Sequence, residues 1–194
     1  TATFSGGGWA LKSSAKYAAY YPHVYENRDL TKIPVSYVGQ TQNGNANTDH
    51  IGAYDFMAAS VTTPSNGAVA FDMQHLGCLV QLTVTVPEPS TLSKITLNTT
   101  YAYITETGYV DLSATTPSII APTKSKSIEI GLTDIKTTEA NEKVIIYFMM
   151  APADLSGTLH ATISREDGTT LETDISGKKL EAGKAYALEE IDKR

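Results

Sequence analysis

The sequence predicts an all-β protein with two β-sandwich domains in tandem. Several short segments alternate between apolar and polar residues, the pattern of a half-buried strand. These segments recur roughly every 8 to 12 residues with turn residues between them, as in sandwich proteins. No segment keeps apolar residues at the helical period over the roughly 10 to 12 residues that a helix needs. Strands therefore form the whole fold.

The clearest strand ends the stretch FDMQHLGCLVQLTVTV, at 71–86. Side chains of a strand point alternately to its two faces, so one face here carries four apolar residues: Val80, Leu82, Val84 and Val86. β-branched residues also pack well on a pleated surface. Pro87 and Pro89 lack the N–H group that a strand ladder needs, so they end the strand.

Before this strand the predicted elements are short. Residues 33–38 form an edge strand, because proline near the start of IPVSYV suits an edge better than a centre. Residues 40–49 (QTQNGNANTD) are a polar loop with an Asn-Gly turn. Residues 54–59 form a short helical turn, and the turn PSNG at 64–67 precedes the central strand.

The second half repeats the pattern. An Asp-Gly pair between two alternating segments is a strong hairpin signal, and it occurs at 167–168. Tyr101, Tyr103 and Thr105 share a strand face, and Gly108 marks a turn. The other predicted strands are 92–99, 109–112, 127–132, 159–164, 170–175 and 184–191.

The segment VIIYFMM at 144–150 is apolar on both faces. A strand of this kind is expected at the centre of a sheet, covered above and below. At an exposed edge it would be an aggregation hazard. The sequence therefore places it in the interior.

The segment PEPST at 87–91 is the best candidate linker. It divides the chain into an N-terminal sandwich at 1–89, whose start we expect to be truncated, and a C-terminal sandwich at 90–194. The opening TATFSGGGW resembles the interior of a domain rather than its start.

Composition excludes several classes of protein. Of the 194 residues, 41% are hydrophobic and 19% charged, which excludes wholesale disorder. The net charge of −6 argues against nucleic-acid binding, because contact with phosphates needs a basic surface. No apolar run approaches the roughly 20 residues of a membrane helix. One cysteine allows no intrachain disulfide and leaves the compartment open.

No catalytic or metal site is expected, and no cofactor. The four histidines (His23, His50, His75 and His160) lie far apart in the sequence, whereas metal ligands usually cluster. Cys78 follows Leu76 and Gly77 in an imitation of a lipoprotein box, but it lies in mid-chain and is expected to be a small buried thiol. Neither a nucleophile motif nor a phosphate-binding glycine loop is present.

Tyrosines are frequent near the start of the chain. Four of them could form a surface patch for a ligand: Tyr17, Tyr20, Tyr21 and Tyr25. More often such residues cover a sandwich face with the hydroxyl at its rim. Both interpretations stay open at this point.

Four segments, in order along the chain, resemble the fimbrillin-like (FimA and Mfa type) pilin family of Bacteroidales. They are Trp9 with the AYYP segment at 19–22, the DFMAA segment at 55–59, the Phe71/His75/Leu76 motif before the central strand, and LEAGKAYAL at 180–188. The family motif is usually Phe-x-His-x-Leu, and here the phenylalanine stands two residues further from the histidine.

The resemblance implies tandem transthyretin-like sandwiches and a lipoprotein precursor at the outer membrane. It implies that the protein is a structural subunit, or a tip or accessory adhesin, of a surface fimbria. Partners would be other fimbrial subunits, and a host or bacterial surface ligand is also compatible with it. A lipid anchor on an upstream region would be the only membrane contact.

Assembly in this family implies removal of an N-terminal strand, followed by strand donation from the next subunit. Candidate walls of the receiving groove are Val80, Leu82, Val84, Val86, Ile146 and Phe148. A monomeric cell-surface module that binds a glycan or a host protein is the alternative function.

Overall fold

The computed structural model describes residues 11–23 and 29–192, and confirms the all-β prediction. The described elements are β1 (Tyr17–Tyr21), β2 (Ile33–Ser36), β3 (Thr41–Asn43), a 3-10 turn η1 (Ile51–Ala53), β4 (Met57–Thr62), β5 (Gln74–His75), β6 (Cys78–Val86), β7 (Thr91–Thr99), β8 (Thr107–Val110), β9 (Ile119–Ile120), β10 (Ser127–Lys136), β11 (Glu142–Met150), β12 (Ala153–Asp154), β13 (Thr158–Arg165), β14 (Thr170–Ser176), β15 (Lys179–Leu180), β16 (Ala185–Ala187) and β17 (Ile191–Asp192). Within the described residues, no helix has the length and apolarity to cross a membrane.

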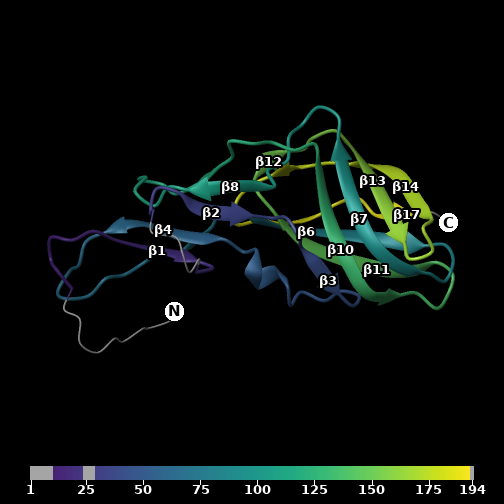
Figure 1. The fold of residues 1–194 in the computed structure, drawn as a ribbon, viewed down its shortest axis with the longest axis horizontal. Coiled ribbons are helices and arrows are strands. Elements are labelled where there is room, and N and C mark those ends of the chain that lie inside the picture. The colour runs from purple at the N-terminus through teal and green to yellow at the C-terminus, as the bar shows by residue number, and fades with distance from the viewer. Residues whose placement is uncertain (1–10, 24–28, 193–194) are drawn as a thin grey trace.

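Two sheets form the main sandwich, at the right of Figure 1. One sheet has five strands in the order β14-β13-β7-β10-β3. The other has the order β11-β6-β16, with β17 also paired to β6. Apolar side chains from both sheets belong to a single buried cluster, which includes Leu82, Ile95 and Phe148. Burial of this apolar area is the main force that holds the two sheets together.

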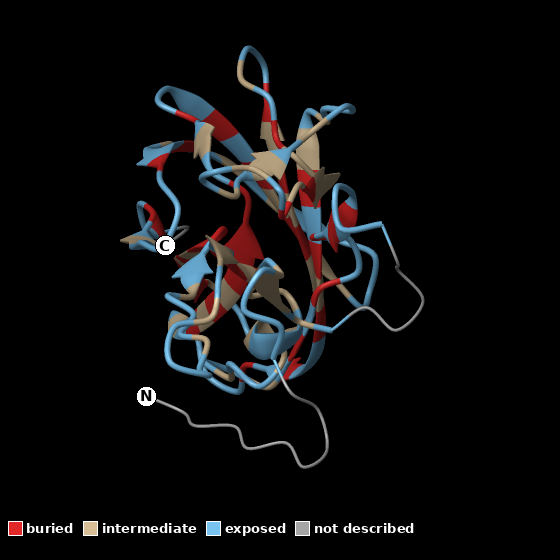
Figure 2. Cartoon of the chain, turned by 90° about the vertical axis from the view of Figure 1, so that its left-hand side faces the viewer, coloured by how far each residue is buried: buried red, intermediate tan, exposed pale blue. Residues whose placement is uncertain are grey.

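Three smaller sheets complete the fold, and β1, β2, β4 and β8 extend the molecule at the left of Figure 1. Their strand orders are β1-β4-β5, β2-β8-β9 and β12-β15. The predicted edge strand at 33–38 is confirmed, because β2 lies at the edge of its sheet. Figure 2 shows that buried residues concentrate in the strands around the interior, while most loops are exposed.

The sheets do not follow the expected division at residues 89 and 90. β11 pairs with β6 along its whole length, from Glu142 opposite Val86 to Met150 opposite Cys78. β3 pairs in parallel with β10, and β16 with β6. Both sheets of the sandwich therefore contain strands from each side of the proline-rich segment at 87–91. That segment connects β6 in one sheet to β7 in the other.

Several local predictions need correction. The helical turn predicted at 54–59 is wrong from residue 57 onward, because residues 57–62 form strand β4, in which Ala58 and Ala59 pair with β1. Tyr101 and Tyr103 lie in a loop and not on a strand, and Gly108 lies within β8. The predicted final strand is divided into β16 and β17. The Asp-Gly hairpin is confirmed, with Ser164 opposite Thr170 and Gly168 at a φ of +85°.

Candidate assembly site at the edges of the four-stranded sheet

The proposed groove residues all lie in the interior of the sandwich. Their side chains are fully buried by this chain itself: Val80, Leu82, Val84, Val86, Ile146 and Phe148. β6 also has neighbours on both sides, β11 on one and β16 with β17 on the other. A strand that adds to this sheet therefore has to use an edge, because the apolar faces are already covered.

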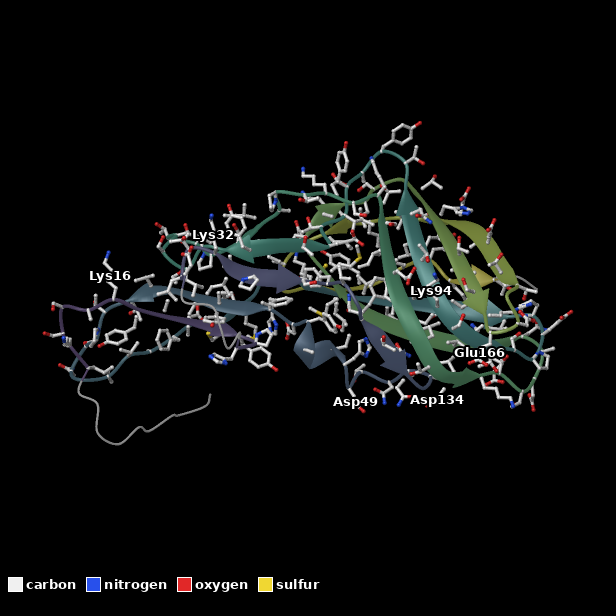
Figure 3. All side chains as sticks on the ribbon, in the orientation of Figure 1. Lys16, Lys32, Asp49, Lys94, Asp134 and Glu166 are labelled. Atoms are coloured by element: carbon white, nitrogen blue, oxygen red, sulfur yellow. The ribbon has the colours of Figure 1, made fainter. Side chains whose placement is uncertain are left out.

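One edge of this sheet is β11, which the sequence had placed at a centre; that prediction is wrong. Its outward-facing backbone groups are occupied by three side-chain amides, Gln40, Gln42 and Asn45, which we call the amide clasp. Gln40 and Gln42 flank β3 residue Thr41 and are buried, while Asn45 follows the turn at Gly44 and is exposed. In Figure 3, Asp49 marks the loop that continues from β3.

Each clasp residue both donates to and accepts from the β11 backbone. Gln40 donates to the Met149 carbonyl at 2.8 Å and accepts from the Met149 N–H at 2.7 Å. Gln42 donates to the Ile145 carbonyl at 2.9 Å and accepts from the Tyr147 N–H at 2.7 Å. These distances are those of well-formed hydrogen bonds.

The exposed end of the clasp completes the series. Asn45 donates to the Lys143 carbonyl at 3.1 Å and accepts from the Ile145 N–H at 2.8 Å. The Ala46 N–H also donates to the Ile145 carbonyl, and His50 Nε2 lies 3.0 Å from the Tyr147 carbonyl. The hydrogen bond to that carbonyl requires a proton on Nε2. Partial burial lowers the pKa of His50 and so favours the neutral ring.

The opposite flank of β6 is covered differently. The C-terminal segment, residues 184–192, contributes two short parallel strands: Tyr186 pairs with Val80, and Ile191 with Val84. Backbone bonds join Leu79 to Lys184 and Leu188 to Gln81. Parallel pairing is slightly less stable per residue than antiparallel pairing. The most buried strand of the sheet thus has a short, two-piece strand as its neighbour.

Side chains fix the C-terminal segment at a few points. Leu188 and Ile191 are buried, so they join the core cluster. Glu190 accepts a hydrogen bond from the Thr85 hydroxyl at 2.8 Å and lies 2.9 Å from Lys143 Nζ. The bond from Lys143, followed by that from Thr85, lowers the pKa of Glu190. The carboxylate therefore connects the segment to both β6 and β11.

The tyrosine patch is not brought together among the described residues. Tyr20 packs against the core cluster, whereas Tyr21, the next residue along β1, is 47% exposed. The Tyr17 hydroxyl accepts a hydrogen bond from the Lys12 N–H. Tyr25 lies outside the described residues. Adjacent residues of a strand face opposite ways, so Tyr20 and Tyr21 belong to different surfaces.

Two other tyrosines are more exposed. Tyr101 is 92% exposed and Tyr103 is 53% exposed, both in the loop after β7. Lys126 Nζ lies 3.9 Å from the Tyr103 ring centre, and it donates to the carbonyls of Thr100, Tyr101 and Ala102. This ammonium group therefore orders the loop, and the sequence offered no local signal for it.

His75 is exposed rather than buried, and its Nδ1 lies 2.8 Å from Asp55 Oδ1. The pair lines a cavity of about 200 Å³ together with Gly77, Met149 and Lys184. Neither residue was singled out by sequence for a pairing, although both belong to family-like motifs. Asp55 and His75 connect the segment before β4 to β5, so the pair has a structural role at this corner.

Two further titratable groups, Cys78 and Tyr37, are buried in the core. Cys78 is buried, and burial raises its thiol pKa to about 12, which disfavours the reactive thiolate. Burial likewise raises the pKa of Tyr37, whose hydroxyl has no hydrogen-bond partner among the described residues. Among the described residues, no group of three His, Cys, Asp or Glu side chains is placed to hold a metal ion.

The clasp was missed by the sequence analysis, which assigned its segment to a polar loop. A period-two pair of glutamines, QTQ at 40–42, was the available signal. Alternation predicts that both amides share one face, but it does not reveal the partner strand about a hundred positions away.

The architecture defines a class: a β-sandwich protein whose distinctive polar contacts lie at sheet edges. The chain belongs to the fimbrillin-like family, whose model matches residues 9–190. This confirms the resemblance.

Two crystal structures share the fold. A proposed cell adhesion protein from Bacteroides uniformis matches with a TM-score of 0.56 at 17% identity, over 89% of this chain and 66% of that one. A second, from Bacteroides ovatus, matches with a TM-score of 0.58 at 18% identity, over 96% of this chain and 67% of that one. This chain thus spans about two thirds of their length. No curated protein sequence matches it significantly.

Proposed function

We propose that this chain is a structural subunit, or a tip or accessory adhesin, of a bacterial surface fimbria that assembles by β-strand donation. Membership of the fimbrillin-like family supports a fimbrial or adhesion-type protein at the cell surface. It also favours a structural role over an enzymatic one. Other fimbrial subunits are the partners expected of such a protein.

The observation that supports assembly by strand donation is the pairing of the C-terminal segment with one side of β6. β6 is the strand with the most buried apolar face, yet β16 has three residues and β17 has two. A strand from a neighbouring subunit that paired over a longer stretch would form more backbone hydrogen bonds. Strand addition of this kind takes its affinity from the main chain and its specificity from side-chain pockets.

The pockets are those that Leu188 and Ile191 fill in this chain. We propose that the C-terminal segment of one subunit exchanges with that of another at this edge. The flank next to β16 and β17 is then the site at which subunits join.

A labelled peptide of residues 184–192 tests this exchange. We expect it to bind the Ile191→Asp chain at least about tenfold more tightly than the unmodified chain, because a buried carboxylate weakens the resident segment. The matched control is the same peptide with Leu188→Asp and Ile191→Asp, which should bind neither. Fluorescence anisotropy measures the affinities, and circular dichroism verifies folding. Failure of the unmodified peptide to bind a folded Ile191→Asp chain would contradict exchange at this edge.

A further inference from the structure

The amide clasp has the geometry of a missing strand. β3 is the last strand of the five-stranded sheet and pairs with β10, and among the described residues no backbone ladder joins it to β11. The side chains of Gln40, just before β3, and of Gln42, within β3, form hydrogen bonds with the β11 backbone. Residues two apart on a strand are about 6.6–6.8 Å apart, which is also the repeat of outward-facing groups on a neighbouring strand. Two glutamines at this spacing therefore match two successive positions of β11.

The order of contacts is that of an antiparallel neighbour. Gln40 contacts Met149, Gln42 contacts Tyr147 and Ile145, and Asn45 contacts Ile145 and Lys143. Residue numbers therefore rise from 40 to 45 in the clasp as they fall from 149 to 143 along β11. A carboxamide carries the same donor and acceptor as a peptide group. The clasp side chains, together with the Ala46 N–H and His50, thus provide hydrogen bonds of the kind that an added strand would provide.

The strand that the clasp contacts, β11, combines an apolar sequence with a position at the edge of its sheet. β11 contains the apolar run VIIYFMM at 144–150, and it forms one edge of its sheet. Exposed edges with such sequences pair with other chains. Covering an edge with a loop or with polar side chains is a known way to prevent this pairing.

We propose that Gln40, Gln42 and Asn45 block strand addition at β11, and that without them β11 pairs with β11 of a second copy of this chain. The occupant is a second copy because the run at 144–150 is apolar on both faces and long enough for an antiparallel pair with itself. Pairing across a twofold axis would bring the same outward groups of Ile145, Tyr147 and Met149 together in both copies. The inference concerns the flank opposite the C-terminal segment, so it stands whether or not subunits exchange that segment.

The main test is the double variant Gln40→Met/Gln42→Met, which keeps side-chain volume and removes both amides. Its matched control is Gln74→Met, at an exposed position on β5. Two measurements are made. NMR monitors the exchange of backbone amide hydrogens, and sedimentation velocity over a range of concentrations reports the association state. In the double variant we expect the Tyr147 and Met149 amides to exchange roughly 10- to 100-fold faster when the protein is dilute, as loss of a buried hydrogen bond implies.

At higher concentration the double variant should dimerise beyond the level of the unmodified chain, and protection of Tyr147 and Met149 should return. The Gln74→Met control should behave like the unmodified chain in both measurements. A folded double variant with unchanged association would overturn the proposed block, even if its amides exchanged faster.

If the double variant does not fold, a single substitution at the exposed end of the clasp tests the same proposal. Asn45→Ala removes only the exposed end of the clasp and leaves both buried glutamines in place. We expect faster exchange at Ile145, with Tyr147 and Met149 unchanged. Unchanged exchange at Ile145 would show that the clasp does not protect this edge, and would overturn the proposal.

Discussion

Phe148→Ala should lower the free energy of unfolding by about 3–5 kcal/mol, the range for truncation of a fully buried phenylalanine. The side chain is completely buried and lies opposite Val80 in the β11–β6 pair. The loss combines the transfer free energy of the ring with the cavity that remains. Urea denaturation followed by circular dichroism measures the change.

The same variant distinguishes a core from an open groove. If Phe148 lined a groove that waits for a donor strand, truncation would change the stability of the isolated chain by less than about 1 kcal/mol, as at exposed sites. Tyr147→Ala is a useful comparison, because the neighbouring side chain is only partly buried and should cost less. Equal and small losses at both positions would contradict the closed sandwich.

Gly177→Ala should cost about 3 kcal/mol or more, at or above the upper end of the usual range for overpacking, because an added methyl group has no space. A Cβ at this position would lie 2.0 Å from the Leu155 carbonyl oxygen and 3.1 Å from that of Gly157. Both are backbone atoms, so relief requires movement of the chain between β12 and β13. The expected result is a lower midpoint of thermal unfolding, measured by differential scanning calorimetry.

Gly168→Ala is the matched control for Gly177→Ala. Gly168 has open space around its Cα, and its φ of +85° carries only the cost of a left-handed conformation, about 1–2 kcal/mol. The Gly177 variant should therefore be clearly the less stable of the two. A reversed order would show that the close approach at Leu155 is not maintained in solution.

Local signals in the sequence predicted the local parts of the fold. The Asp-Gly turn joins β13 to β14, and the alternation from Val80 to Val86 places four side chains in the core. Each of these depends on residues near one another in the chain. Periodicity and turn chemistry are sufficient for such elements.

Pairing between distant segments could not be predicted in this way. The apolar run at 144–150 is predicted at a centre because it is apolar on both faces, but this pattern does not distinguish a central strand from an edge strand covered by side chains. Gln40 contacts Met149 across 109 positions of sequence. The parallel pairing of β16 with β6 is also long-range, and it places strands from both sides of residue 89 in one sheet.

The candidate site was predicted only in part for the same reason. Val80 and Val84 do lie in register with the C-terminal segment, although their side chains are buried. Lys126 donates to three carbonyls of the loop that carries Tyr101, and these contacts exist only in the folded chain. The sequence contains no motif that predicts the contacts of the amide clasp or of this loop without the folded structure.

The most direct test of assembly by strand donation is the mass and oligomeric state of the full-length precursor before and after limited cleavage by an arginine-specific protease. Mass spectrometry, light scattering and electron microscopy follow the products. The account predicts that cleavage removes an N-terminal strand and releases ordered polymers, and that the Ile191→Asp precursor is cleaved but polymerises poorly. A precursor that is cleaved and stays monomeric would contradict strand donation and favour a monomeric surface module that binds a glycan or a host protein.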